Sequence, residues 1–268
     1  MFRTSPQRSL LLVLIAFAFA AFPLVLLANH SWNGYHWARQ SNPFTVKLGN
    51  NVGSLWQTSL TNASADWSQS TVLDTSIVTG GTRPRNCRPT SGRDEVCSAS
   101  YGNTGWLGLA QIWLTSGNHI AQGIVKLNDT YFSPGSQYDT ASWCALVTCQ
   151  EIGHTFGLDH QDTNFNNANL GTCMDYTNDP STNQHPNAHD YAELDIIYSH
   201  LDGTTTIGQS VTGSAFPDID TSDPRNWGQL KKLSPDGRTA IYELDLGGGR
   251  KIVTFVIYAL EANGHRPQ

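Results

Sequence analysis

Charged residues are scarce in this chain of 268 residues. Asp, Glu, Lys and Arg make up 14% of it, against about 25% in typical soluble proteins. The net charge is −6 and there is no long basic run, which argues against nucleic acid as a partner. Trp, Gly, Asn, Ser and Thr are plentiful instead, a balance typical of a secreted protein with a polar, uncharged surface.

Long apolar runs are absent after residue 28, so no later segment is expected to span a membrane. One such run opens the chain, from Leu10 to Ala28, and Arg3 and Arg8 precede it. A basic segment followed by an apolar one is the pattern of a signal peptide, so we predict that residues 1–28 direct secretion. The run is also long enough to cross a bilayer, which takes about 20 residues. A membrane anchor formed by residues 10–28 is therefore the alternative.

The cysteine count is low and odd. An exported chain meets oxidising conditions, so its five cysteines should form disulfides and leave one thiol unpaired. Cys87 and Cys97 bracket a short polar loop and are expected to pair. We predict a second bond between Cys149 and Cys173, which leaves Cys144 free. A bond from Cys173 to Cys144 is the alternative, because sequence does not fix connectivity.

Apolar spacing predicts a mixed α/β domain over residues 29–202. Strands are expected at 44–48, 72–78, 95–101, 105–115 and 119–128, and helices at 54–67, 141–156 and 189–201. Residues 203–238 are rich in Gly, Ser, Thr, Asp and Pro and are predicted to be a linker. Residues 239–268 form a small tail with a hairpin signal at Gly247–Gly249. The sequence leaves open whether this hairpin packs on the main domain or meets a partner.

The most informative stretch reads QEIGHTFGLDH, residues 150–160. Its first part falls on a predicted helix, where positions i and i+4 share one face. Gln150 and His154 therefore project together, with Glu151 one step round the helix. Gly157 lets the chain turn sharply after the helix, and His160 can then return to the same point.

This arrangement suits a catalytic metal. Three protein ligands and a water make the open four-coordinate site of catalytic zinc, and the metal lowers the pKa of that water to about 7. Glu151 is placed to take the proton, which favours hydrolysis of peptide bonds. Gln150 is the unusual ligand, because a neutral amide oxygen binds zinc less readily than imidazole does. We therefore expect weaker zinc binding than three histidines would give.

The pattern resembles the zinc-binding signature of the metzincin clan of metalloproteases, in particular its matrixin branch. The matching positions are Glu151, His154, Gly157 and His160. Gln150 departs from the family, which has histidine at this place. A protein that had lost its activity would accumulate substitutions at these positions. The presence of all four residues together therefore favours a working metal site over a decayed one.

A second segment, TCMDY, supports the resemblance. Met174 stands where metzincins carry their Met-turn, and Tyr176 stands where astacin-like and serralysin-like members carry a tyrosine that binds the metal or steadies the oxyanion. Over residues 44–201 the resemblance implies a zincin-like α/β (α+β) fold. That fold has a mixed twisted sheet with an N-terminal helix, an active-site helix and a C-terminal helix, here followed by the small β-hairpin appendage. The resemblance also implies that residues 105–115 form the edge strand along which a protein or peptide substrate lies extended.

The resemblance thus implies a secreted zinc-dependent endopeptidase. Its expected ligands are Gln150, His154 and His160, its general base is Glu151, Tyr176 stabilises the transition state, and Met174 and Gly157 are structural. Two alternatives remain open. One is a catalytically inactive domain that binds a peptide through the same cleft. The other is a structural protein anchored by an uncleaved N-terminus.

Three further histidines, His185, His189 and His200, are candidates to replace Gln150 as a ligand. Ca²⁺ is a second candidate ion, because Asp162, Asn164 and Asn166 alternate as at the start of a calcium loop. The glycine and the closing glutamate of such a loop are absent, however, so turn formation explains these residues better. Two tryptophans on the supposed edge strand, Trp106 and Trp113, are candidates for substrate contact or for packing.

Overall fold

The computed structural model describes residues 30–209, 216–217 and 219–260. The predicted signal or anchor segment, residues 1–28, lies outside this part. Within the described residues, no helix is both long enough and apolar enough to cross a membrane.

One nine-stranded sheet runs through the molecule in the order β3-β2-β4-β6-β5-β9-β8-β7, with β1 paired to β6. The strands are β1 His36–Trp37, β2 Phe44–Asn51, β3 Leu73–Thr79, β4 Asp94–Ala99, β5 Trp106–Thr115, β6 His119–Asn128, β7 Gln229–Leu233, β8 Thr239–Gly247 and β9 Arg250–Tyr258. Strands β1 to β4 pair in parallel, whereas β5 and β7 to β9 pair antiparallel with their neighbours. The predicted mixed sheet is confirmed.

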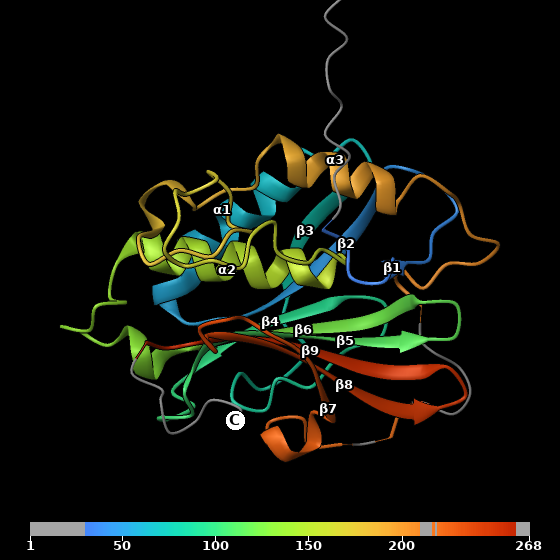
Figure 1. Ribbon diagram of the computed structural model, residues 1–268. Helices are drawn as coiled ribbons and strands as arrows, with labels where there is room; N and C mark the ends of the chain where they lie inside the picture. The colour runs from blue at the N-terminus through green and yellow to red at the C-terminus, as the bar shows by residue number, and fades with distance from the viewer. Residues whose placement is uncertain (1–29, 210–215, 218, 261–268) are drawn as a thin grey trace, which may run out of the picture.

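Three α-helices lie over one face of the sheet, as Figure 1 shows. They are α1 Gln57–Trp67, α2 Ala141–Thr155 and α3 Ala188–Ile197, and short 3₁₀ turns occur at Ser54–Trp56, Asp129–Phe132, Pro180–Thr182 and Pro224–Asn226. The Thr140 side chain accepts a hydrogen bond from the Trp143 amide and so caps α2. Helix α3 ends four residues before the predicted Leu201, whose side chain is exposed.

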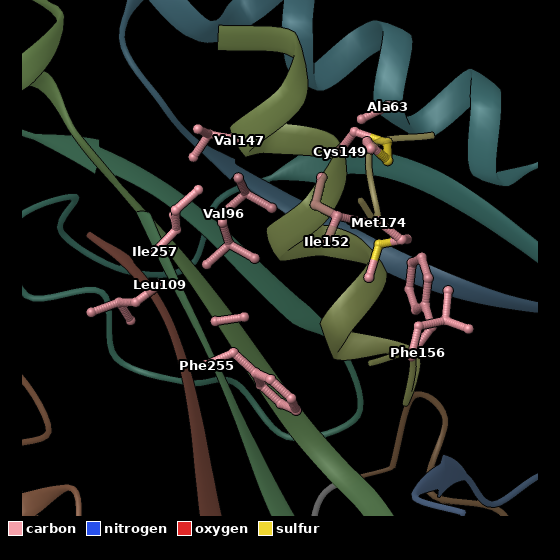
Figure 2. Packing of buried hydrophobic residues seen from close by; sticks show 14 of the residues in the cluster. Ala63, Val96, Leu109, Val147, Cys149, Ile152, Phe156, Met174, Phe255 and Ile257 are labelled. Atoms are coloured by element: carbon pink, nitrogen blue, oxygen red, sulfur yellow. A yellow bond between two sulfur atoms is a disulfide. The ribbon is translucent and has the colours of Figure 1, made fainter. Parts of the chain in front are cut away.

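The main core fills the space between the helices and the sheet. Val96 and Ile257 of the sheet, Val147 and Ile152 of α2, and Met174 from a loop are all buried there (Figure 2). Burial of one such side chain stabilises the fold by roughly 1.5–3 kcal/mol. This packing fixes α2, and with it the residues of the motif, against the middle of the sheet.

Both predicted disulfides are present, Cys87–Cys97 and Cys149–Cys173. Cys144 is the unpaired cysteine and is buried. The alternative pairing of Cys144 with Cys173 is therefore excluded. The second bond ties α2 to the loop that carries Met174, so it holds the two parts of the motif together.

The C-terminal hairpin packs on the main domain, which the sequence left open. Strand β9 pairs antiparallel with β5 from Trp106 to Leu114, and β7, which lies within the predicted linker, pairs with β8. The expectation that residues 105–115 form a sheet edge is wrong, because β5 has β6 on one side and β9 on the other. The reason is apolar burial. Strand β9 is buried from Ile252 to Tyr258, so it needs a covered sheet position.

Candidate metal centre

Two histidines face each other at the end of α2. The Nε2 atoms of His154 and His160 are 3.1 Å apart. The Nδ1 atom of His154 lies 2.8 Å from the Leu158 carbonyl oxygen, and that of His160 lies 3.3 Å from a carboxylate oxygen of Asp159. The Leu158 carbonyl is an acceptor, so Nδ1 of His154 carries the hydrogen and its Nε2 presents a lone pair. Nδ1 of His160 also contacts the Tyr176 hydroxyl, at 2.9 Å. Ligands of a tetrahedral zinc ion are about 3.3 Å apart at bonds of about 2.0–2.1 Å, so the spacing fits a shared ion.

Electrostatics favour the uncharged imidazoles that a metal needs. Burial lowers the pKa of His154 well below its usual value, and burial also lowers that of His160. Burial by itself would raise the pKa of Asp159, but its hydrogen bonds with His160 and Lys232 bring that pKa well below its usual range. Asp159 therefore stays ionised beside the His160 ring and holds its orientation.

Gln150 lies one helical turn before His154 and is almost fully buried. Its Nε2 donates a hydrogen bond to the Cys173 carbonyl oxygen at 2.9 Å, which fixes which end of the amide is oxygen. The Oε1 atom finds no hydrogen-bond partner among the residues that the structure describes. Such an unsatisfied buried acceptor is costly, and a bound cation would satisfy it. Two imidazole nitrogens and one amide oxygen are donor types that zinc accepts.

Glu151 follows Gln150 on α2 and is also buried. Its Oε2 atom has no hydrogen-bond partner within the described part of the chain, and burial raises the pKa of this carboxyl well above its usual value. Strand β5 passes close by at Gly108. A Cβ atom there would lie 2.6 Å from Val147 Cγ1 and 3.1 Å from Glu151 Cγ, so only glycine lets the strand come this near.

Met174 and Tyr176 complete the site from the next loop. Met174 lies beside α2 (Figure 2), where its sulfur is 2.7 Å from the position that a Cβ atom on Gly153 would take. The Tyr176 hydroxyl is 2.9 Å from Nδ1 of His160. It therefore contacts the side of the ring away from the Nε2 that faces His154. In this conformation the Tyr176 side chain packs against His160 and helps to hold the orientation of its ring.

Gly157 makes the turn between the two histidines. Its φ is +94°, and a Cβ atom would lie 1.9 Å from the Tyr35 carbonyl oxygen. We predict that Gly157→Ala lowers the free energy of unfolding in urea by at least about 2 kcal/mol, from backbone strain and this clash. The control is Gly171→Ala, which has φ +73° but no atom within 4 Å of the added Cβ. Equal losses in both variants would contradict the role of the clash.

The C-terminal segment covers this site. The Phe255 ring of β9 stacks on His154, with centroids 4.3 Å apart and planes 6° apart. Lys232 of β7 places its Nζ 2.6 Å from Asp159 Oδ2, and Thr239 of β8 hydrogen-bonds Tyr176. The candidate ligands and the candidate base of the motif, Gln150, Glu151, His154 and His160, are each at most 7% exposed. Sequence reasoning missed Lys232 and Phe255, because no local pattern shows what a distant strand will contact.

The three alternative ligands have other neighbours. The imidazoles of His185, His189 and His200 lie against Asp66, His30 and His36 respectively. None of these contacts involves the pair His154 and His160. Gln150 thus remains the candidate for the third ligand.

The remaining candidates are explained by local structure. Asp162 accepts a hydrogen bond from the Asn164 amide, and Asn164 accepts one from the Asn166 amide, as turn-forming residues do. Trp106 and Trp113 are buried. They line a cavity of ≈ 670 Å³ whose lining includes no residue of α2, so this cavity is separate from the helix that carries the motif.

Comparison with known proteins adds little. The sequence matches no protein-family model and no curated protein. Among solved structures, myroilysin is 11% identical with a TM-score of 0.36, covering 64% of this chain and 99% of that one. The hatching enzyme zinc-protease high choriolytic enzyme 1 from Oryzias latipes is 10% identical with a TM-score of 0.34, covering 64% and 98%. A second myroilysin structure has 12% identity and a TM-score of 0.32, covering 61% and 86%. These values are too low to transfer a function.

Proposed function

We propose that the protein is a secreted zinc-dependent peptidase whose cleft is closed by its own C-terminal hairpin. One observation carries this proposal: the Nε2 atom of His154, on the helix that also carries Glu151, is 3.1 Å from the Nε2 atom of His160, which follows that helix. This spacing is close to the distance of about 3.3 Å between two ligands of one tetrahedral zinc ion. The buried, unpartnered oxygen of Gln150 on the same helix adds a third donor.

The chain supplies binding, orientation and proton transfer. Zinc, when bound, would polarise a peptide carbonyl and lower the pKa of water. A cation bound beside Glu151 would lower the pKa that burial raises, and the ionised Glu151 would take a proton from the attacking water and give it to the leaving amine. Leu158 holds the His154 imidazole in the tautomer that binds metal, and Asp159 holds the orientation of the His160 ring. The Tyr176 hydroxyl contacts His160 and would have to leave this ring before it could steady a developing charge.

The substrate would be an extended peptide. Strand β5 runs next to Glu151, and its outer backbone groups now pair with β9. When β9 leaves, these N–H and C=O groups are available to pair with a substrate strand. The hairpin therefore occupies the place that we propose for the substrate.

Metal content tests the site. We predict that untagged protein purified without chelators loses one equivalent of zinc on His154→Ala, because one of its imidazole ligands is gone. The matched control is His185→Ala, an exposed histidine paired with Asp66, which should change nothing. Measurement is by inductively coupled plasma mass spectrometry. Equal zinc in the His154→Ala variant and the parent would show that no zinc is bound here.

Gln150 can be tested separately. We predict that Gln150→His binds zinc at least about 10-fold more tightly than the parent, since imidazole is a better zinc donor than a neutral amide. Competition with a chromophoric chelator measures the affinity. An unchanged affinity would mean that residue 150 does not contact the metal.

A catalytically inactive binding module is the second candidate. The observation that favours it is the closed site, in which Phe255 covers His154. The two candidates differ in one result, namely whether the opened protein hydrolyses peptides.

A further inference from the structure

A second cluster of metal-binding side chains lies at the end of β1. It consists of His36, His200 and Asp202, whose ligand atoms all lie within 4.8 Å of one another. The sequence did not indicate it, because His36 is 164 positions from His200. Nothing in the proposed peptidase site uses these residues.

The three donor atoms form a triangle. Nε2 of His36 is 3.2 Å from Nε2 of His200 and 3.5 Å from Oδ1 of Asp202. The third side, from His200 Nε2 to Asp202 Oδ1, is 3.7 Å. A face of a zinc tetrahedron has sides of about 3.3 Å. Two of the three sides are at or beyond the usual limit of a good hydrogen bond, so a shared ion explains the convergence better than direct bonds do.

Neighbouring groups orient the metal-binding atoms of His36 and Asp202. Nδ1 of His36 lies 2.7 Å from the Gly34 carbonyl oxygen, so it carries the hydrogen and leaves the Nε2 lone pair in the cluster. The other oxygen of Asp202, Oδ2, accepts hydrogen bonds from the backbone amide and the guanidinium of Arg39, at 3.1 and 3.0 Å. Oδ1 is thereby directed at the imidazoles. Such outer contacts are what orient ligands in metal sites.

A fourth imidazole borders the cluster. The parallel pairing of β1 with β6 places His36 opposite His119. Nε2 of His119 is 3.2 Å from the same Oδ1 of Asp202, and its ring lies edge-on to that of His36 at 5.0 Å. Three imidazoles around one carboxylate oxygen is a composition typical of zinc sites.

We propose that His36, His200 and Asp202 bind a second zinc ion, with His119 at its border. This ion would be structural. It would join β1, at the start of the described chain, to the segment that follows α3. Arg39 already connects these two segments through its contacts with Asp202 and the Tyr198 carbonyl oxygen. The site is independent of the proposed peptidase centre and of its activity.

The test uses the full-length, untagged chain carrying His154→Ala, so that the first site is disabled. We expect this protein to retain close to one zinc per chain. After removal of metal by chelation, added zinc should raise its melting temperature. Adding His200→Ala should weaken zinc binding by at least about 10–100-fold, the loss typical of an outer partner alone. The His200 side chain is half exposed, so this change should not unfold the protein.

The control in the same background is His185→Ala, another exposed histidine that pairs with a carboxylate outside the cluster. It should keep both the zinc and the thermal shift. Asp202→Asn, which keeps the shape of the side chain, should weaken binding as His200→Ala does. The proposal is overturned if the His154→Ala chain holds no zinc and gains no stability from it. It is equally overturned if His200→Ala binds zinc as tightly as its parent.

Discussion

Cutting the chain after Gln209 should raise its peptidase activity by about 10- to 1,000-fold, because open minor states are typically populated at 0.1–10%. The covering strands β7, β8 and β9 all follow this point, and Gln209 is exposed. While the chain is intact, a linked segment acts at an effective concentration of roughly millimolar. Once it is cut, dilution of the protein to nanomolar concentration favours departure of the segment.

The experiment places a recognition sequence for a site-specific protease after Gln209. The full chain folds first and is then cut, and a quenched fluorescent peptide reports hydrolysis. Size-exclusion chromatography shows whether the segment has left, and metal analysis shows whether zinc is retained. A synthetic peptide of residues 229–260 should restore inhibition. The uncut protein with the same insertion is the control.

Two outcomes contradict this prediction in different ways. If the uncut chain is as active as the cut one, the hairpin does not block the site. The other outcome is that the segment leaves and zinc is retained, but no peptide is hydrolysed. In that case the protein is a binding module and the peptidase proposal fails.

A milder change probes the same closure without cutting. In the intact chain, Lys232→Ala should raise activity by about 1.4- to 5-fold, since a partly exposed ion pair is worth about 0.2–1 kcal/mol. Lys232 contacts Asp159 beside the metal ligands, whereas Lys231 on the same strand contacts Gln229. Lys231→Ala should therefore leave activity unchanged.

Replacing Glu151 with glutamine should lower kcat/KM of the opened protein by about 10²–10⁴-fold, the usual contribution of a general base. An amide has nearly the same shape as the carboxylate but cannot take the proton. Because Glu151 is not among the proposed ligands, zinc content should stay at the parent's value. The measurement combines peptide hydrolysis with metal analysis of the same sample.

Glu193→Gln is the matched control for this variant. Glu193 is equally buried, but it lies beside His30, with 3.9 Å between its Oε2 and the His30 Nδ1. It should leave kcat/KM unchanged. Activity that survives Glu151→Gln, with zinc present, would rule out the proposed proton transfer.

Much of the fold could be predicted from local patterns. The spacing of apolar residues indicated α2, and the helix begins at Ala141 as predicted, with Thr140 as its cap. Cys149 pairs with Cys173 as expected, since a cysteine beside each part of the motif favoured that bond. Such signals are readable because helix periodicity, caps and turns depend on residues a few positions apart.

Long-range contacts escaped prediction. The edge assigned to residues 105–115 was wrong because β9 pairs with β5 from about 140 to 150 positions away, and the largely apolar stretch in β9 shows only that it is a buried strand. The cluster of His36, His200 and Asp202 was missed for the same reason.

By itself, the sequence determined which residue types stand at i, i+1 and i+4 of one helix, and therefore which chemistry that helix can carry. Only the tertiary structure decided that the two imidazoles meet at 3.1 Å, that Phe255 lies over one of them, and that β5 has no open edge. The physical reason is that sheet pairing and burial select partners by complementary shape and apolar area, and these are properties of the folded chain as a whole.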